Sequence, residues 1–228
     1  MIIHVLTIFP DMFKFPLHQS ILGKAQERGY VDINIHNLRD FADGTRRTTD
    51  DTPYGGGCGM VMKPEPVYKA VDHIKEESKI ETENTSVILT CPQGEKFNQD
   101  MAKELKEKHT LIFICGRYEG VDERIRNLVD REISIGDYVL TGGELPAMVI
   151  IDTVVRLIPG VLGNQDSIKT DSFFGPSLGY PQYTRPPVFR GLEVPKVLLS
   201  GDHNQIELWR KKRSLERTRL RRPDIFKS

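Results

Sequence analysis

The sequence predicts an α/β domain with a mostly parallel sheet, followed by a small helical C-terminal domain. Three observations predict this fold class. Apolar strand-like runs alternate with helical patterns over about the first 160 residues. Several of these runs are continuously hydrophobic, as are strands of a parallel sheet that is covered on both faces. The end of the chain is instead polar and basic, with a helical pattern.

The first elements follow from simple periodicities. Residues 2–9 form a hydrophobic run and are expected to be the first strand. A helical pattern over residues 17–28 stops at Gly29, a residue type that commonly ends helices. Residues 31–38 alternate apolar and polar side chains with period two, which predicts a half-buried strand. A long polar and glycine-rich stretch follows, over residues 39–62.

The middle of the chain continues the alternation. Further strands are expected at residues 86–90, 111–115 and 132–135, and helices at residues 64–77, 98–108, 121–129 and 144–158. The first of these helices has proline near its start, where proline is favoured. The last is almost wholly apolar and is therefore expected to be buried on most sides.

The composition changes near residue 160. Residues 159–189 are rich in Gly, Pro, Ser and Asp and are too long for an ordinary loop, which predicts a functional linker. We expect a first domain over residues 1–160, an interdomain linker over 161–180 and a helical domain over 181–228. A basic helix or helix pair is expected at 202–222.

Charge is distributed unevenly, although the formal net charge is zero. Residues 203–228 carry nine Lys or Arg and three Asp or Glu, a net charge of +6, so the rest of the chain carries −6. A basic end on an acidic body suggests a surface that binds a polyanion such as nucleic acid. A solvated helix face explains the charge equally well.

Composition excludes several classes of protein. Hydrophobic residues make up 38% and charged residues 28% of the 228 residues, as in an ordinary soluble protein. No window approaches the roughly 20 apolar residues of a membrane span, and the N-terminus lacks the basic flank and cleavage site of a signal peptide. Three widely separated cysteines fit reduced thiols in the cytoplasm. Six scattered histidines give no zinc-site spacing.

Four segments are richer in glycine and turn residues than structure alone requires. They are residues 53–60, 90–94, 116–120 and 135–146, and the last three follow predicted strands. Ligands of open α/β sheets bind beyond the carboxyl ends of the strands, so these three loops are candidates for one shared pocket. The alternative is three unrelated tight turns. A P-loop hydrolase and a dinucleotide-binding domain are disfavoured because their glycine motifs are absent from the sequence.

Longer motifs carry a resemblance to one family. They are Pro-Tyr-Gly-Gly-Gly-Cys-Gly-Met (53–60), Arg-Tyr-Glu-Gly-Val-Asp-Glu-Arg (117–124), Ser-Ile-Gly-Asp-Tyr-Val-Leu-Thr-Gly-Gly-Glu-Leu-Pro (134–146), Pro-Gly-Val-Leu-Gly (159–163), Asp-Ser-Phe (171–173), Tyr-Thr-Arg-Pro (183–186) and Val-Leu-Leu-Ser-Gly-Asp-His (197–203). In this order, over nearly the whole chain, they closely resemble the bacterial tRNA (guanine-N1)-methyltransferases, the TrmD family of the SPOUT class.

The resemblance implies a fold and an activity. SPOUT enzymes tie a deep trefoil knot in their α/β domain, which pattern analysis would not propose because knots are almost absent from proteins. The family is homodimeric, binds S-adenosylmethionine in a bent form within the knot, and builds each active site from both subunits. It methylates N1 of the guanosine at tRNA position 37, next to the anticodon.

The implied chemistry needs a base and a cation. N1 of guanine carries a proton at neutral pH, so a general base must remove it while a cation stabilises the charge that develops on O6. By resemblance, Asp171 is the general base and Arg156 assists at O6. The structural alternatives are an N-cap or turn aspartate for the first and an ion pair with Asp152 for the second.

The same resemblance assigns a cofactor site. The residues expected to bind S-adenosylmethionine, largely through backbone groups, are Leu89, Pro92, Gly94, Gly116, Tyr118, Glu119, Ile135, Gly136, Tyr138, Leu140, Gly142, Gly143 and Pro146. Glu119 matches a carboxylate near the methionine part of the cofactor and near a magnesium site; a charge at a helix N-terminus is the alternative. The family's Mg²⁺ dependence is implied as well, but the sequence fixes no ligands for the metal.

The basic C-terminal domain is the expected grip on the tRNA anticodon arm. Its phosphate contacts would give affinity rather than base choice. Arg46, Arg47 and Asp50, beside the first glycine segment, are further RNA candidates, whereas Trp209 is expected to belong to the core. Gly179 stands where the family pattern has an acidic residue.

Two other functions compete with this interpretation. A knotted methyltransferase that acts on a ribose 2′-oxygen is disfavoured, because ribose attack would not need the base in the Asp-Ser-Phe segment. A non-catalytic RNA-binding protein explains the basic tail but not the three glycine loops.

Overall fold

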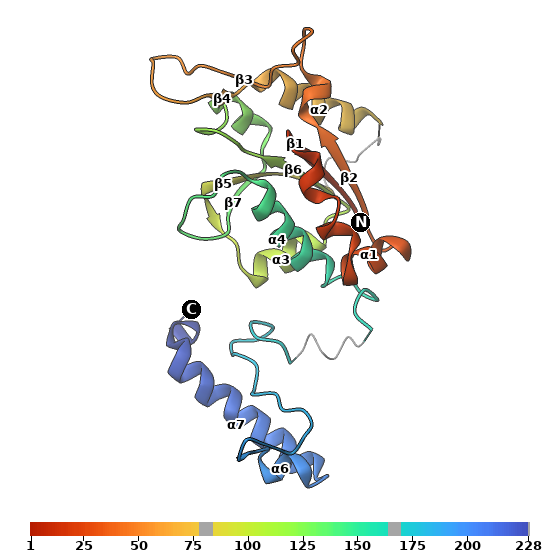
Figure 1. The fold of residues 1–228 in the computed structure, drawn as a ribbon, viewed down its shortest axis with the longest axis vertical. Helices are drawn as coiled ribbons and strands as arrows, with labels where there is room; N and C mark the ends of the chain where they lie inside the picture. The colour runs from red at the N-terminus through yellow and green to blue at the C-terminus, as the bar shows by residue number, and fades with distance from the viewer. Residues whose placement is uncertain (78–83, 164–169, 228) are drawn as a thin grey trace. The chain divides into compact units, whose positions relative to one another are not determined.

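The structure, a computed structural model, describes residues 1–77, 84–163 and 170–227 (Figure 1). The chain divides into two compact units, Met1–Gly163 and Asn164–Ser228. The first contains an open α/β sheet, and the second contains a long helix and a short hairpin. The finer division expected from the sequence, with a separate linker over residues 161–180, stays a prediction.

A five-stranded sheet forms the centre of the first unit, and every neighbouring pair of its strands is parallel. The strand order is β2-β1-β6-β5-β7. The strands are β1 (Ile2–Thr7), β2 (Asp32–Asn37), β5 (Thr85–Lys96), β6 (Thr110–Cys115) and β7 (Arg131–Ser134). The predicted α/β class with a mostly parallel sheet is therefore confirmed.

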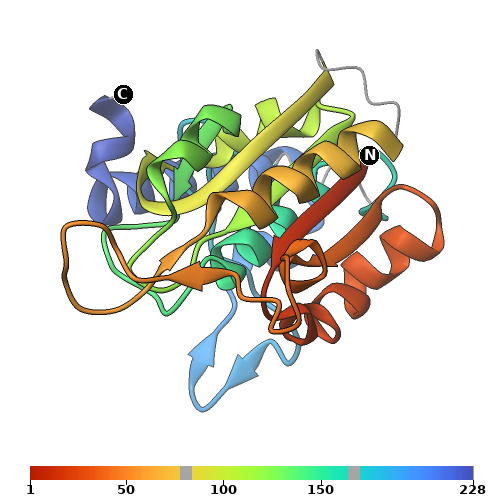
Figure 2. The same ribbon diagram turned by 90° about the horizontal axis from the view of Figure 1, so that it is seen from above.

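Helices cover both faces of this sheet (Figure 2). They are α1 (Ser20–Glu27), α2 (Pro64–Glu77), α3 (Gln99–Lys106) and α4 (Glu144–Val155). Helices α1, α3 and α4 pack on one face and α2 on the other. Along β6, Leu111 and Phe113 join the first core while Ile112 and Ile114 join the second, since successive side chains of a strand point to opposite faces. A strand between two helical layers must be apolar throughout, which explains the continuous hydrophobic run.

Strand β5 is longer than the expected strand over residues 86–90. After Thr90 its pairing with β7 breaks, and it resumes where Glu95 and Lys96 pair with Ile133 and Ser134. The residues between form a bulge, which places an extra segment at the edge of the pairing. The sequence prediction ended too early because Pro92 and the residues after it are typical of a turn.

The predicted amphipathic helix over residues 121–129 is wrong in type. The segment forms a 3-10 helix, η5 (Glu123–Leu128). Val121 is bridged to Met62 on one side, and Asp130 is hydrogen-bonded to Val87 on the other. The stretch between these fixed points is too short for an α-helix to recover its nucleation cost.

The glycine-rich segment 53–60 connects the two strands of a small antiparallel hairpin. These strands are β3 (Asp50–Asp51) and β4 (Val61–Met62), and the loop projects from the first unit (Figure 1). The amide of Met62 donates to the carbonyl of Gly120 at 3.0 Å. The hairpin is therefore attached beside the loop that follows β6.

The second unit is organised around a long helix, α7 (His203–Arg221). Asp202 caps it by accepting hydrogen bonds from the amides of Asn204 and Gln205, so the predicted basic helix is confirmed. A hairpin of β8 (Val188–Phe189) and β9 (Leu192–Glu193) and a short helix, α6 (Lys196–Leu199), precede it. The hairpin could not be predicted from the sequence, because two-residue strands carry no periodicity.

None of the helices among the described residues combines the length and the hydropathy that a membrane-crossing segment requires.

Candidate functional site

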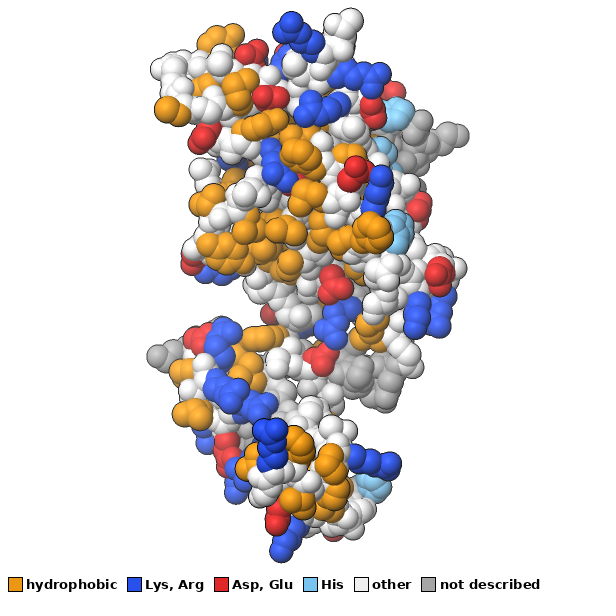
Figure 3. All heavy atoms as spheres, in the orientation of Figure 1, with side chains coloured by type: hydrophobic (Ala, Val, Ile, Leu, Met, Phe, Trp, Pro, Cys, Tyr) orange, Lys and Arg blue, Asp and Glu red, His pale blue; other side chains and the backbone are white. Residues whose placement is uncertain are grey.

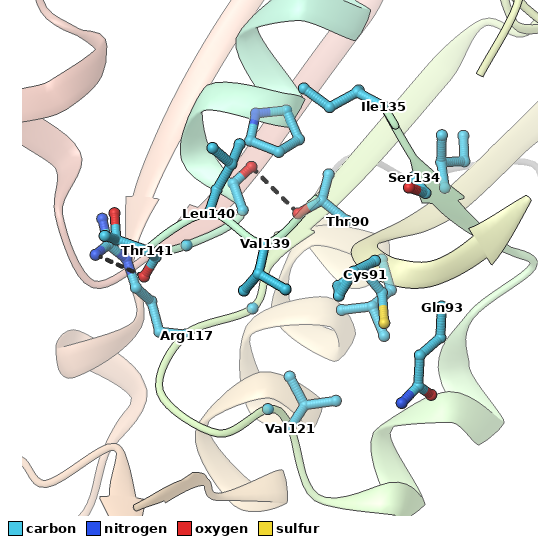
Figure 4. A pocket seen from close by; sticks show the side chains of 18 of the residues that line it. Thr90, Cys91, Gln93, Arg117, Val121, Ser134, Ile135, Val139, Leu140 and Thr141 are labelled. Atoms are coloured by element: carbon cyan, nitrogen blue, oxygen red, sulfur yellow. Dashed lines mark hydrogen bonds between the residues drawn. The ribbon is translucent and has the colours of Figure 1, made fainter. Parts of the chain in front are cut away.

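A cavity of about 470 Å³ opens at the carboxyl ends of β5, β6 and β7 (Figure 4). Segments 89–93, 116–121 and 133–143 line it, together with the start of α4. Parallel sheets bind ligands at this end of their strands, and the volume is typical of small-molecule sites. The three glycine loops thus meet at one cavity, as the shared-pocket interpretation expected, and are not unrelated turns.

The chain before α4 passes between the ends of β5 and β6. The amide of Gly143 donates to the carbonyl of Gly116 at 2.8 Å. The buried Thr90 hydroxyl lies 3.2 Å from the carbonyl oxygens of both Gly143 and Ile114. A Cβ atom on Gly143 would lie 2.0 Å from Thr90 Oγ1 and 2.9 Å from Gly116 N. Only glycine permits this close passage.

Arg117 joins two walls of the cavity. Its Nε pairs with Glu144 Oε2 at 2.9 Å. Its Nη1 donates to the carbonyl of Thr141 at 3.1 Å, as Figure 4 shows. Its guanidinium also lies 4.4 Å from the centre of the Phe9 ring. Glu144 is fully buried. The pKa of the neighbouring Cys115 thiol is raised, mainly because Cys115 is itself buried and secondly because of the negative charge of Glu144.

Tyr118 is held beside the cavity in an unusual backbone conformation. Its φ of 62° is rare for a residue with a side chain. Its hydroxyl donates to Asp50 Oδ1 at 3.3 Å. Burial, and then the charge of Asp50, raise the pKa of this hydroxyl. Asp50, which the sequence analysis named as an RNA candidate, therefore contacts the rim of the cavity.

A second arginine, Arg126 of η5, also lines the cavity. It pairs with Glu123 at 2.9 Å and with Glu132, and its Nη2 donates to Gln93 Oε1 at 3.2 Å. These contacts connect η5 to the bulge of β5. The lining of the cavity therefore combines charged side chains, such as Glu123 and Arg126, with apolar ones, such as Leu140 and Ile135.

All but one of the residues expected to bind the cofactor line this cavity. The exception is Gly94, which lies in the bulge of β5 against the backbone of β7. A Cβ atom there would lie 2.4 Å from the carbonyl carbon of Glu132. Gly94 thus permits the close packing of two strands, and its predicted role at the cofactor stays a prediction.

The cavity also contains residues that the sequence analysis did not select. They are Thr90, Cys91, Gln93, Arg117, Gly120, Val121, Glu123, Arg126, Ile133, Ser134, Val139 and Thr141. Most of them lie within or next to the glycine segments, so the segments themselves were the available signal. Arg126 had no such signal, because it lies outside the glycine segments and the quoted motifs and only the fold brings it to the cavity.

Arg156 is not among the residues that line the cavity. Arg156 is the partly buried residue that ends α4 in the first unit, and its amide donates to the carbonyl of Asp152. Asp171 belongs to the second unit, where its carbonyl accepts a hydrogen bond from the amide of Phe174 at 3.4 Å. The roles of Asp171 as general base and of Arg156 as the partner of O6 stay predictions.

Helix α7 of the second unit carries exposed basic side chains along its length, among them Lys211 and Lys212. Trp209 is partly buried, with its ring centre 6.4 Å from that of Tyr183 and the guanidinium of Arg213 5.9 Å from its own ring centre. The helix thus packs through some side chains and presents its cations to solvent. Such a surface can bind phosphates.

No three His, Cys, Asp or Glu side chains within residues 1–77, 84–163 and 170–227 are grouped as a metal site.

Comparison with known proteins places the whole chain in one group. The family model described as tRNA (Guanine-1)-methyltransferase TrmD matches residues 1–228. The tRNA (guanine-N(1)-)-methyltransferase of Dictyoglomus turgidum is 58% identical over 224 residues, which cover 98% of this chain and 89% of the relative. The enzymes of the same name from Anoxybacillus flavithermus and Carboxydothermus hydrogenoformans are each 58% identical. Both alignments cover 99% of this chain, with 91% and 87% of the respective relative.

Proposed function

Because this chain belongs to the tRNA (guanine-1)-methyltransferase family, we propose that it transfers a methyl group from S-adenosylmethionine to N1 of the guanosine at tRNA position 37. The observation that carries the proposal is the match of the family over all 228 residues, together with the cavity into which the family's glycine motifs converge.

The cavity suits S-adenosylmethionine in size and chemistry. The glycine loops line the cavity, and the proposal assigns the hydrogen bonds to the adenine and ribose to backbone groups of these loops. Leu140, Ile135 and Pro146 supply apolar contacts for the adenine ring. When bound, the donor supplies an electrophilic methyl group on its sulfonium. The proposed reaction contains no step that uses Mg²⁺, and no residue is proposed as its ligand.

The passage of residues 142–143 between the ends of β5 and β6 supports a SPOUT trefoil knot. In such a knot the chain before the last helix is threaded between earlier loops of the same domain. The close contacts of Gly143 with Thr90 and Gly116 are what this threading requires.

The proposed chemistry uses Asp171 and Arg156. The carboxylate of Asp171 accepts the proton of guanine N1, which frees the lone pair that attacks the methyl group. The guanidinium of Arg156 stabilises the negative charge that moves onto O6. The proposal keeps the arrangement that the resemblance implies, in which each active site is built from both subunits of a dimer.

A homodimer is part of the proposal. Helix α4 is strongly apolar, yet Leu145 and Val149 are 49% and 47% exposed, and Val139 in the preceding loop is 85% exposed. Hydrophobic side chains gather over this part of the first unit (Figure 3). An exposed apolar patch of this kind marks an interaction surface, and a second copy of the chain would cover it, as in the SPOUT dimers that the resemblance implies. Sedimentation velocity tests this point.

The basic face of α7 is the proposed grip on the anticodon arm, where its cations contact phosphates. A tRNA substrate and three free cysteines fit a cytoplasmic enzyme.

Methyl transfer to defined RNA tests the function. The protein is incubated with labelled S-adenosylmethionine and a tRNA transcript that carries guanosine or adenosine at position 37. We expect 1-methylguanosine, identified by mass spectrometry, only with guanosine. A methylated ribose, or equal labelling of both transcripts, would refute the proposal.

The Asp171→Asn variant tests the general base. We expect a single-turnover rate at least about 100-fold lower, because general-base catalysis contributes at least that factor. The dissociation constant for S-adenosylmethionine should not change. Asp100→Asn, an equal change on the exposed face of α3, serves as the matched control. A near-normal rate for Asp171→Asn would remove the assignment.

A further inference from the structure

Three polar side chains form a connected network behind the cavity. Glu144, at the start of α4, accepts a hydrogen bond from the Thr7 hydroxyl at 2.8 Å through Oε1. Through Oε2 it pairs with Arg117 Nε at 2.9 Å. Thr7 and Glu144 are fully buried and do not line the cavity, whereas Arg117 does.

The network ends on both walls of the cavity. Arg117 belongs to the loop after β6 and is bridged to Gly142 in the loop before α4. Its Nη1 bonds the carbonyl of Thr141 in that second loop at 3.1 Å. A Cβ atom on Gly142 would lie 2.2 Å from Arg117 Nε and 2.5 Å from Glu144 Oε2, so the second loop packs directly on the ion pair.

Burying a carboxylate to hold two loops together has a free-energy cost. Taking its charge out of water costs several kcal/mol, as an order of magnitude, and a well-packed apolar contact would often be at least as stable. What the network provides is direction, because the planar guanidinium fixes its partners at set angles. Thr7 in turn fixes the carboxylate, so the end of β1 sets the orientation of Arg117.

We propose that Thr7 and Glu144 are positioning residues for the methyl donor. They orient Arg117, and Arg117 holds the loops at 116–120 and 137–143 at the separation that the donor needs. The proposal rests on the proposed function, which places the donor in this cavity. The side chains of Thr7 and Glu144 are both fully buried and outside the lining of the cavity.

This role separates donor binding from chemistry. Loosening the network lets the two loops move apart, which weakens donor binding. The proton transfer at guanine N1 and the charge on O6 are handled by other residues. The KM for S-adenosylmethionine should therefore rise, while kcat at saturating donor should stay nearly unchanged.

The test compares two buried threonines that undergo the same change. Thr7→Val removes the hydroxyl that donates a hydrogen bond to Glu144 and accepts one from the amide of Phe9. Thr49→Val removes a hydroxyl that is equally buried but has no hydrogen-bond partner among the described residues. We expect the KM of Thr7→Val to rise about tenfold, which corresponds to leaving a hydrogen bond to a charged group unmade. Thr49→Val should stay within about twofold of the unaltered protein, and Thr7→Ser, which keeps the hydroxyl, should restore the original KM.

Two further variants keep the test decisive if Thr7→Val does not fold. Glu144→Gln removes the negative charge, and Arg117→Lys keeps the positive charge but cannot bond Glu144 and Thr141 together. Both should raise the KM in the same direction, and calorimetric titration should give the same change in the dissociation constant.

The inference is wrong if these variants retain the KM of Thr49→Val, or if kcat falls while the KM is unchanged. Absence of donor binding by the unaltered protein would instead refute the proposed function. The two failures are therefore distinguishable.

Discussion

Replacing Gly143 by alanine tests how closely the chain passes between β5 and β6. Its φ and ψ of −83° and −4° are ordinary for any residue, so alanine meets no backbone strain at this position. The obstacle is steric. The added methyl group would lie 2.0 Å from Thr90 Oγ1, 2.9 Å from Gly116 N and 3.0 Å from Cys115 Cα. Two of these three atoms are backbone atoms at the end of a central strand.

The magnitude follows from which atoms can move. The Thr90 hydroxyl must shift by more than an ångström, and it then loses buried hydrogen-bond partners at Ile114 and Gly143. Leaving a buried hydroxyl unsatisfied costs about 1–3 kcal/mol, and overpacking a core costs about as much. We therefore expect Gly143→Ala to lower the free energy of unfolding by roughly 2–4 kcal/mol.

Urea unfolding followed by circular dichroism measures this loss, and calorimetric titration with S-adenosylmethionine measures the effect on the cavity. Gly163→Ala is the matched control, because a Cβ atom there has no neighbour within 4 Å among the described residues. It should change the free energy of unfolding by less than about 0.5 kcal/mol. If Gly143→Ala is as stable as Gly163→Ala and binds the donor equally well, the close passage argued above does not exist.

Two further predictions concern charge. The double variant Lys211→Gln and Lys212→Gln should weaken tRNA binding and reduce the slope of log K against log salt concentration by roughly 0.7–0.9 per charge removed; Lys24→Gln, on the first unit, should leave the slope unchanged, and equal slopes for all the proteins would exclude α7 from the RNA surface. Burial, and then the neighbouring His36, lower the pKa of His4 from 6.5 to about 4. The unfolded chain therefore binds more protons between these pH values, and stability falls as the pH drops from 6.5 towards 4. His4→Leu should show a smaller decline in urea titrations over this range, whereas parallel curves would contradict the assignment.

Most of the elements could be predicted because their signals are local. The continuous apolar run of β6 and the proline near the start of α2 specify their structures through neighbouring residues alone. The same holds for α7, where Asp202 caps a long basic helix. The predicted elements were wrong in type or length where contacts between residues far apart in the sequence determine the structure. The segment of η5 is fixed at both ends by other parts of the chain, and β5 resumes its pairing only because β7 is beside it.

For the candidate site, too, some residues could be predicted from local sequence and others could not. The glycine segments were recognisable because several glycines in a few positions are unusual, and nearly all of the residues expected at the cofactor do line the cavity. Gly94 and Glu144 were not interpretable from the sequence. Gly94 resembles its neighbours but faces the backbone of β7, and Glu144 looks like an ordinary charge at the start of a helix.

The sequence by itself determined the order of strands and helices, the loops that carry ligand chemistry and the basic character of the last helix, since all of these depend on residues close together along the chain. Tertiary structure alone decided that Thr90, Gly116 and Gly143 meet, and that Thr7 reaches Glu144 across 137 positions. Such contacts form only when the sheet brings distant strand ends to one edge, and no local pattern records which ends will be neighbours.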